Sequence, residues 1–131
     1  MECYSVETLT FKNPILRNVT TSVLITMVGS KRRAQYMAEL ARQRPTEKVV
    51  VLHNQGRKRC RKHGVRNSLQ DLWHANQQAF AMVPPGEAVL ILEDDVRFLP
   101  EFAAYAIEIE HFLLQQKGPC AYNLGAHVLV S

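Results

Sequence analysis

Three stretches of the chain are apolar and rich in β-branched residues, and they lack the strict alternation of a strand that faces water on one side. They are TSVLITMV at 21–28, KVVVLH at 48–53 and AVLIL at 88–92. Strands that are buried on both faces have this pattern. The sequence therefore predicts three interior strands of a parallel sheet, followed by a last short strand near 121–124.

Segments with apolar residues at helical spacing separate these strands. The first covers 31–44, with Ser30 available as an N-cap and Pro45 at its end. The second follows Ser68, another candidate N-cap, and the third covers 101–116. The residues predicted to form the apolar faces are Ala34, Met37, Ala38 and Ala41 in the first helix and Leu69, Leu72, Trp73, Asn76, Ala79 and Phe80 in the second.

Strands that alternate with helices are typical of an α/β fold with a mostly parallel sheet and helices on both faces. We expect a single domain over residues 1–131, in which 1–20 form an N-terminal extension. In such sheets, ligands bind at the carboxyl ends of the strands. The polar or turn-forming residues at these ends are Gly29, Ser30, Asn54, Glu93, Asp94 and Asp95.

Three successive carboxylates, Glu93, Asp94 and Asp95, follow the third strand. Packing gives no reason to crowd them, because each ionised carboxylate makes its neighbour harder to ionise. Their oxygen atoms suit Mg²⁺ and Mn²⁺, and alternation along an extended chain turns Asp94 away from the other two. A solvated loop with helix-capping acids is the simpler interpretation, but the position after a buried strand favours a metal site.

With 47% hydrophobic and 21% charged residues, the composition is that of an ordinary soluble domain. No apolar run approaches the roughly 20 residues that cross a bilayer, so we expect no membrane span. Residues 1–20 also lack the basic start and apolar stretch of a signal peptide. Three widely separated cysteines, Cys3, Cys60 and Cys120, are a poor basis for a disulfide framework and favour a reducing compartment. We therefore expect a cytoplasmic protein, with the Golgi or endoplasmic reticulum lumen as the alternative if a targeting segment has been lost.

The formal net charge of +4 depends on one segment, residues 57–66, hereafter the basic loop. Without its six cations the formal net charge would be −2. These cations are Arg57, Lys58, Arg59, Arg61, Lys62 and Arg66. The loop could bind the phosphates of a diphosphate donor or an anionic acceptor, it could bind nucleic acid, or it could simply be solvated. Because no aromatic residues alternate with the cations, stacking on single strands has little support, and nucleic acid is not the expected partner.

The stretch VLILEDDVRFLPEF resembles the hallmark of GT-A glycosyltransferases, particularly the lipooligosaccharide-type and related viral or algal sugar transferases. The shared features are an apolar strand, a DXD-like acidic motif in the form EDD, and an aromatic residue and a proline that open a helix. VLITMVGSKRRAQYM resembles the nucleotide-facing first β-α unit of these enzymes, SLQDLWHANQQAF the helix before the acidic strand, and YNLG the strand after it. The resemblance spans roughly residues 22–125 and depends mainly on the acidic motif.

This resemblance implies a Rossmann-like GT-A fold and the metal-dependent transfer of a sugar from a nucleoside-diphosphate donor to a glycan or glycoprotein acceptor. Asp95 would bind Mn²⁺ or Mg²⁺ directly, together with Glu93, and the metal would neutralise the departing diphosphate. The residues implied to bind the donor are Ser30, Arg32, Arg33, Glu93 and Asp94. A plain N-cap for Ser30, and exposed helix charges for the two arginines, are the alternatives.

The chain departs from this family in one respect. It ends at Ser131, before the part that usually completes the acceptor site and supplies a catalytic base, so no residue is assigned as the base. We expect a fragment, a minimal catalytic core or a degenerate relative. Two other classes stay open. A Mg²⁺-dependent phosphoryl-transfer domain of receiver type would need another aspartate at the end of the first or second strand, and a small basic module would bind nucleic acid through the basic loop.

Overall fold

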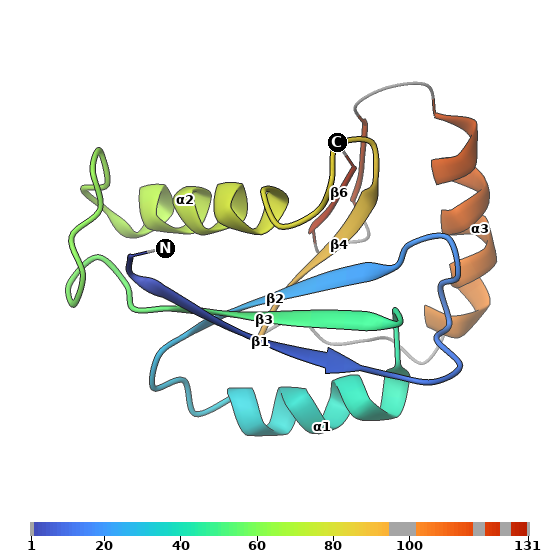
Figure 1. The fold of residues 1–131 in the computed structure, drawn as a ribbon, viewed down its shortest axis with the longest axis horizontal. Helices are drawn as coiled ribbons and strands as arrows, with labels where there is room; N and C mark the ends of the chain where they lie inside the picture. The colour runs from blue at the N-terminus through green and yellow to red at the C-terminus, as the bar shows by residue number, and fades with distance from the viewer. Residues whose placement is uncertain (1, 95–101, 117–119, 124–126, 131) are drawn as a thin grey trace.

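The computed structural model describes residues 2–94, 102–116, 120–123 and 127–130 of the chain. These residues form six strands and three helices (Figure 1). In chain order the elements are β1 (Tyr4–Thr10), β2 (Thr21–Met27), α1 (Arg33–Gln43), β3 (Lys48–Asn54), α2 (Ser68–Phe80), β4 (Ala88–Glu93), α3 (Phe102–Gln115), β5 (Cys120–Asn123) and β6 (His127–Val130). The predicted interior strands and helices are all present, with ends that differ by one or two residues from the prediction.

The strands form one mixed sheet in the order β1-β3-β2-β4-β6-β5. β2 lies between β3 and β4 and pairs in parallel with both, whereas the other pairings are antiparallel. The α/β class is therefore confirmed, but the prediction of a mostly parallel sheet is wrong. The error arises because β1 and β6, which the sequence pattern did not indicate, both add antiparallel pairings beside the parallel centre.

The strand β1 comes from residues that were predicted to form an N-terminal extension. It pairs along its whole length with β3, from Tyr4 opposite Asn54 to Thr10 opposite Lys48. It lies at the edge of the sheet, and most of its side chains are exposed. Edge strands commonly carry charged residues such as Glu7, which discourage pairing with another chain. The sequence YSVETLT therefore lacks the apolar run that marks an interior strand.

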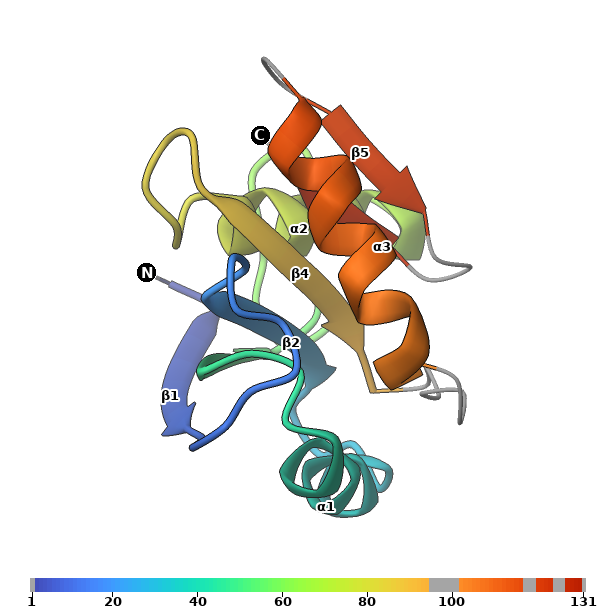
Figure 2. The same cartoon turned by 90° about the vertical axis from the view of Figure 1, so that its right-hand side faces the viewer.

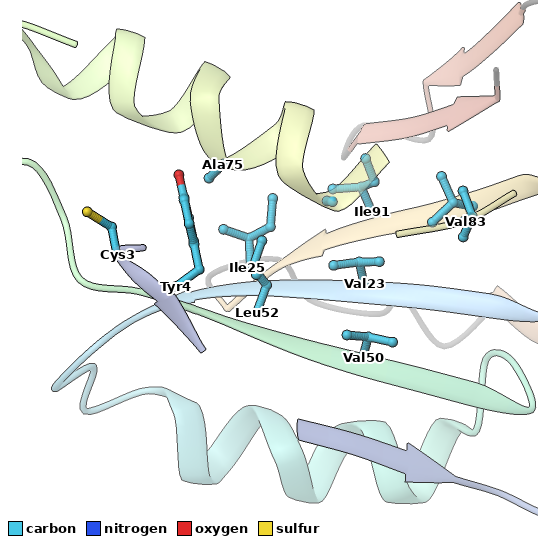
Figure 3. Packing of buried hydrophobic residues seen from close by; sticks show 11 residues of the cluster. Cys3, Tyr4, Val23, Ile25, Val50, Leu52, Ala75, Val83 and Ile91 are labelled. Carbon is cyan, nitrogen blue, oxygen red and sulfur yellow. The ribbon is translucent and has the colours of Figure 1, made fainter. Parts of the chain in front are cut away.

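Helices cover both faces of the sheet (Figures 1 and 2). Successive side chains of the central strands alternate between the two faces and so enter two separate cores. On the α2 face, shown in Figure 3, the strands contribute Val23, Ile25, Val50, Leu52, Val89 and Ile91. On the opposite face they contribute Leu24, Val49, Val51, Leu90 and Leu92. Tyr36 and Leu40 of α1, Ala106 of α3, and Leu16 and Val19 from the segment before β2 complete this second core.

The buried face of α1 agrees with the predicted one in Met37, which packs against the core, and differs elsewhere. Tyr36 and Leu40 are buried, whereas Ala34, Ala38 and Ala41, which were predicted to form the apolar face, are exposed. Alanine is a strong helix former because it loses no side-chain entropy, and this property serves an exposed surface equally well. Helical spacing of alanines is therefore a weak sign of burial.

The buried face of α2 agrees with the prediction in part, because Ala79 and Phe80 pack in the core as predicted. Asp71, Ala75 and Ala79 are buried, and Leu69 and Trp73, which were predicted to face the core, are exposed. Two causes act together. The small alanines let the helix lie close to the sheet, and Asp71 turns inward to pair with Lys62, a buried cation that follows β3 in the sequence. The apolar pattern of the helix could not indicate this second cause.

Both predicted N-caps are wrong. The side chain of Asn67, rather than Ser68, caps α2 by accepting a hydrogen bond at 2.9 Å from the backbone N–H of Gln70. The N-cap position of α1 is Arg32, whose side chain makes no capping hydrogen bond. The hydroxyl of Ser30 is used at a different place, at the end of the sheet.

Candidate functional site

Two polar clusters lie at the carboxyl ends of the parallel strands, on opposite faces of the sheet. The first, hereafter the Asp94 cluster, consists of Thr26, Ser30 and Asp94. The second, hereafter the Lys62 cluster, consists of Asn54, Lys62 and Asp71. The two faces follow from strand alternation, which directs Thr26 to the α1 face and Asn54 to the α2 face.

In the Asp94 cluster, one carboxylate oxygen accepts two hydrogen bonds from hydroxyl groups. Asp94 Oδ2 lies 2.8 Å from Thr26 Oγ1 and 2.6 Å from Ser30 Oγ. Ser30 and Asp94 are 64 residues apart in the sequence, and they meet because β4 pairs in parallel with β2. The structure therefore brings together two of the residues that the family resemblance implied for donor binding. Two donors on a carboxylate also restrict its orientation.

The loop between β2 and α1 turns sharply at Gly29. The φ angle of Gly29 is +83°, a conformation that residues with a side chain rarely adopt. The backbone N–H of Ser30 donates to the carbonyl oxygen of Met27 at 3.0 Å and closes the turn. The Ser30 hydroxyl also accepts from the backbone N–H of Arg32 at 3.3 Å. Ser30 therefore links this loop to Asp94 instead of capping the helix.

Arg59 of the basic loop lies on the same turn. Its Nη1 donates to the carbonyl oxygen of Val28 at 3.4 Å, and a Cβ added at Gly29 would lie 3.7 Å from that nitrogen. Arg59 is also exposed, so its guanidinium has a defined position and remains accessible to an anion. The sequence pattern did not distinguish Arg59 from its neighbouring cations. Only the packing of the basic loop against the β2–α1 loop identifies it.

The two arginines predicted to face the donor have different surroundings. Arg33 Nη1 lies 3.3 Å from His53 Nδ1, and His53 Nε2 lies 3.0 Å from Glu7 Oε1. These contacts fit a neutral histidine protonated on Nε2, which accepts from Arg33 and donates to Glu7. Arg32 is exposed just before α1. Arg33 is therefore directed towards β3, and Arg32 is the more accessible of the two to a phosphate.

The predicted metal ligands fall only partly within the described residues. Asp95, the residue implied to be the direct ligand, lies outside them. Glu93 is the last residue of β4 and is half-buried. Within residues 2–94, 102–116, 120–123 and 127–130, no three His, Cys, Asp or Glu side chains gather in an arrangement that could hold a metal ion. Glu93 and Asp94 could supply part of a ligand set, so the metal site stays a prediction.

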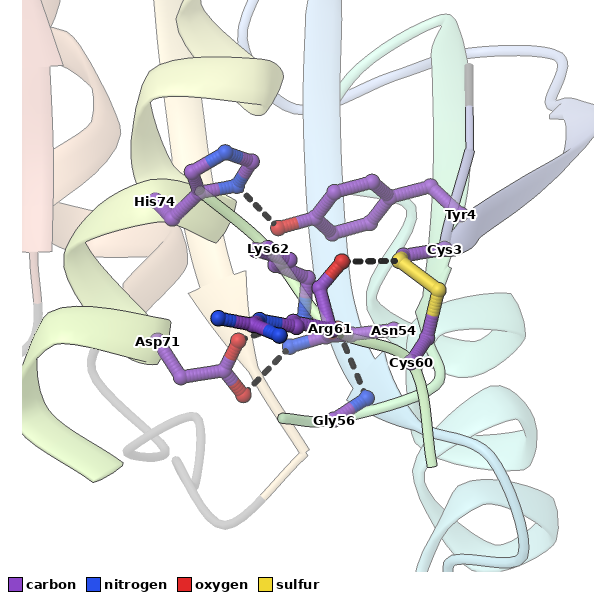
Figure 4. The surroundings of a disulfide bond; sticks show 9 residues. All are labelled: Cys3, Tyr4, Asn54, Gly56, Cys60, Arg61, Lys62, Asp71 and His74. Carbon is purple, nitrogen blue, oxygen red and sulfur yellow. Dashed lines mark hydrogen bonds and ion pairs between the residues drawn. A yellow bond between two sulfur atoms is a disulfide. The ribbon is translucent and has the colours of Figure 1, made fainter. Parts of the chain in front are cut away.

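Lys62 forms a buried ion pair on the other face of the sheet (Figure 4). Its Nζ donates to Asp71 Oδ1 and, at 2.7 Å, to Asn54 Oδ1, and its side chain is 2% exposed. Asn54 Nδ2 in turn donates to Asp71 Oδ2 at 3.2 Å, and the backbone N–H of Gly56 donates to Asn54 Oδ1 at 2.9 Å. Buried charges persist in proteins when they are paired in this way. Lys62 is therefore not a surface cation, and including it among the binding residues of the basic loop is wrong.

Tyr4 extends the Lys62 cluster towards β1. Its hydroxyl lies 2.7 Å from His74 Nδ1, and Lys62 Nζ lies 5.0 Å from the centre of its ring. Burial of the phenol, and then the nearby negative charge of Asp71, raise the pKa of Tyr4 to about 12. The hydroxyl therefore stays protonated at physiological pH and is able to donate to His74.

A disulfide joins Cys3, just before β1, to Cys60 in the basic loop (Figure 4). The two Cα atoms lie 5.5 Å apart, which is within the usual range for a disulfide. The cysteine count, which favoured a reducing compartment, did not indicate this bond, because the spacing of three cysteines contains no geometry from which to choose a pair. The bond and the buried Lys62 hold the basic loop at two points. The disulfide and Lys62 together restrict the position of Arg59.

Comparisons with known proteins do not place the chain in a family. No protein-family model matches it, and no curated protein or solved structure is significantly similar to it. No helix in the described part of the chain is long and apolar enough to cross a membrane. The function is therefore inferred from the geometry of the site and from the acidic motif.

Proposed function

We propose that the chain is a metal-dependent glycosyltransferase with a Rossmann-like fold of the GT-A type. It would transfer a sugar from a nucleoside-diphosphate donor to a glycan or glycoprotein acceptor. The observation that carries the proposal is the hydrogen bond from Ser30 to Asp94. This bond ties the turn after β2 to the acidic motif at the end of β4, at the carboxyl ends of the strands, where α/β sheets bind their ligands.

The charges near this bond suit a nucleoside diphosphate. Arg59 lies on the Gly29 turn, and Arg32 follows this turn closely in the sequence. Two exposed cations therefore border the β2–α1 loop, whose Ser30 binds Asp94. They would attract diphosphate oxygens, and the amino end of α1 would add its dipole. Among the described contacts, both hydroxyl groups donate to Asp94 Oδ2. Oδ1 would therefore be the oxygen that accepts from a hydroxyl group of the donor.

A divalent cation, Mn²⁺ or Mg²⁺, belongs to the proposal. Glu93 and Asp95 would hold it, because carboxylate oxygens are ligands that both ions prefer. When bound, the ion would neutralise the negative charge that develops on the departing diphosphate. Asp94, which is held by two hydroxyl groups, would orient the donor instead. This division agrees with the alternation of side chains along an extended chain.

The disulfide changes the compartment that we propose. Disulfides persist in oxidising compartments and are rare in the cytosol. We therefore favour the lumen of the secretory pathway over the cytoplasm for this chain. Alkylation of cells before lysis, followed by mass spectrometry, tests this proposal. Protection of Cys3 and Cys60 from the alkylating reagent would support it, and full labelling of both would contradict it.

Calorimetric titration with UDP and with GDP, each in the presence and absence of Mn²⁺, tests the transferase proposal. We expect binding that requires Mn²⁺ and is lost in Asp95→Ala. Asp94→Asn should weaken binding about tenfold, because it removes the charge from one polar contact to the donor. Glu47→Gln is the matched control, since this exposed carboxylate precedes β3, at the opposite end of the parallel strands, and should not affect the affinity.

Two results would contradict the transferase proposal. If the folded protein bound neither nucleotide in Mn²⁺, an active transferase would be excluded. If the protein bound oligonucleotides with an affinity that fell steeply with salt and did not change in Asp95→Ala, the chain would instead be a basic nucleic-acid-binding module.

A further inference from the structure

The outward face of α2 carries an apolar pair and no acidic or basic side chain. Leu69 and Trp73, one helical turn apart, are 76% and 64% exposed. Apart from a histidine, the one charged residue of the helix is Asp71, which is buried in its pair with Lys62. Helices on the surface of soluble proteins usually direct charged residues towards the solvent. The exposed side of α2 is therefore uncharged, which is unusual for a surface helix, and it presents Leu69 and Trp73 among polar residues such as Gln70 and Gln77.

Exposed cations precede this apolar pair along the chain. Lys58, Arg61 and Arg66 are exposed in the basic loop, just before α2. The backbone N–H of Arg66 donates at 2.7 Å to a glutamine side chain in the first turn of the helix, which fixes this end of the loop against α2. Between residues 48 and 86 the one acidic residue is the buried Asp71. Figure 1 shows the basic loop extending beyond the sheet at the end where α2 begins.

We propose that these residues form a docking surface for a bilayer that contains anionic lipids. The surface, hereafter the α2 patch, consists of Lys58, Arg61, Arg66, Leu69 and Trp73. Tryptophan is enriched at the interface between lipid and water, and leucine gains free energy when it leaves water. Basic residues beside such an apolar pair are attracted to anionic head groups. This proposal does not depend on transferase activity.

A lipid surface suits the α2 patch better than a nucleic acid or a protein does. Trp73 could stack on a base, but Leu69 offers no such contact, and no aromatic residues alternate with the cations. Two apolar side chains also cover only part of the roughly 800 Å² that each partner buries in a specific protein complex. A bilayer requires only a few inserted side chains and a diffuse positive charge.

Fluorescence tests the proposal directly, because Trp73 is the single tryptophan of the chain. The protein would be titrated with vesicles of phosphatidylcholine, with and without phosphatidylglycerol. We expect a blue shift of the emission on vesicles that contain phosphatidylglycerol and little change on pure phosphatidylcholine. High salt should weaken the binding, because it screens the attraction between the basic residues and the head groups.

Two double variants with the same net charge give a matched comparison. Arg61→Gln/Arg66→Gln removes two cations of the α2 patch, whereas Lys12→Gln/Arg17→Gln removes two exposed cations outside it. About 1 kcal/mol for each charge near the bilayer predicts about 30-fold weaker vesicle binding for the first variant. The second variant should bind about as well as the unmodified protein.

Leucine variants test the apolar contribution. Leu69→Asn should weaken vesicle binding, whereas Leu114→Asn, at a leucine of α3 that is 65% exposed, should not. Circular dichroism would establish that each variant is folded. The absence of a blue shift on anionic vesicles, or equal losses in the two double variants, would overturn the proposal. A blue shift with single-stranded oligonucleotides but not with vesicles would also overturn it, because the α2 patch would then bind a polyanion.

Discussion

Reduction of the Cys3–Cys60 disulfide should lower the free energy of unfolding by about 4 kcal/mol at 25 °C. In the chain-entropy description, a disulfide stabilises a protein mainly by restricting its unfolded chain, and the effect grows with the logarithm of the loop length. The two cysteines are 57 residues apart. For a loop of this length the relation gives about 14 cal/mol/K, which is about 4 kcal/mol at 25 °C.

Native contacts near the bond indicate that the folded state does not depend on it. The backbone N–H of Gln55 donates to the carbonyl oxygen of Cys3 at 2.9 Å. β1 also pairs with β3 along its whole length, which holds Cys3 beside the basic loop without the bond. Reduction should therefore leave the folded state nearly unchanged and act on the unfolded chain.

The assay is urea unfolding followed by circular dichroism, in a Cys120→Ser background where Cys3 and Cys60 are the remaining cysteines. The oxidised protein would be compared with the protein in excess phosphine reductant. For a small domain with a slope of about 1.5 kcal/mol per molar urea, the transition midpoint should fall by roughly 2.7 M. Cys3→Ser/Cys60→Ser in the same background is the control, because its midpoint should not change when the reductant is added.

Two results would refute this reasoning. Two reactive thiols in the urea-unfolded protein before reduction would mean that the bond does not form. A loss of less than about 1 kcal/mol on reduction would mean that the bond does not restrict the unfolded chain as the loop length requires.

Three further predictions concern the neighbourhood of this bond. Lys62→Met or Asp71→Leu alone should lower the free energy of unfolding by about 3–5 kcal/mol, because each leaves a buried charge unpaired. The double variant should lose less than the sum of the two single losses. Urea unfolding measures these losses, and additive losses would contradict the prediction. The difference in absorbance titration between the protein and Tyr4→Phe should have its midpoint near pH 12 rather than near 10. Because the folded pKa of Tyr4 lies above its unfolded pKa, the contribution of this shift to stability is complete below about pH 10 and is lost as the pH rises to about 12. A difference in stability between the protein and Tyr4→Phe that stays constant from pH 10 to pH 12 would contradict it. Gly56→Ala and Gly64→Ala should each cost about 1 kcal/mol in urea unfolding, because their φ angles are +78° and +77°. Unchanged stability in both would show that the turns relax.

Local sequence pattern was a good guide to the interior of the sheet. β2, β3 and β4 begin where their apolar runs begin and end within one residue of the prediction. A strand that is buried on both faces must be apolar along its length, whichever elements cover it, so its signal lies in its own residues. β1 has no such signal because an edge strand is largely exposed, and its pairing with β3 is a contact between distant parts of the chain.

The orientation of the helices could not be predicted in the same way. Leu69 and Trp73 gave α2 an apolar stripe, but the helix buries Asp71 because Lys62 lies beneath it. The position of Asp71 as the first acid after a long basic segment was a signal for this pair. Pattern within the helix carried no information about a partner outside it.

The candidate site shows the same division. Ser30 and Asp94 were both predicted from their positions at strand ends, but their hydrogen bond exists because β2 and β4 are neighbours in the sheet. In the sequence Arg59 is one of six cations in the basic loop, and only the packing of the folded chain shows that it lies on the Gly29 turn. No spacing in the sequence indicated that position.

The sequence by itself determined the buried strands, the presence of the helices and the acidic motif, because these follow from the properties of consecutive residues. Only the tertiary structure decided which strands pair, which helix faces are buried, which cysteines join and which cation meets the loop after β2. Each of these depends on a contact between residues that are far apart along the chain. The free energy of such a contact depends on the burial and geometry of the two residues. The neighbours of either residue in the sequence do not define these quantities.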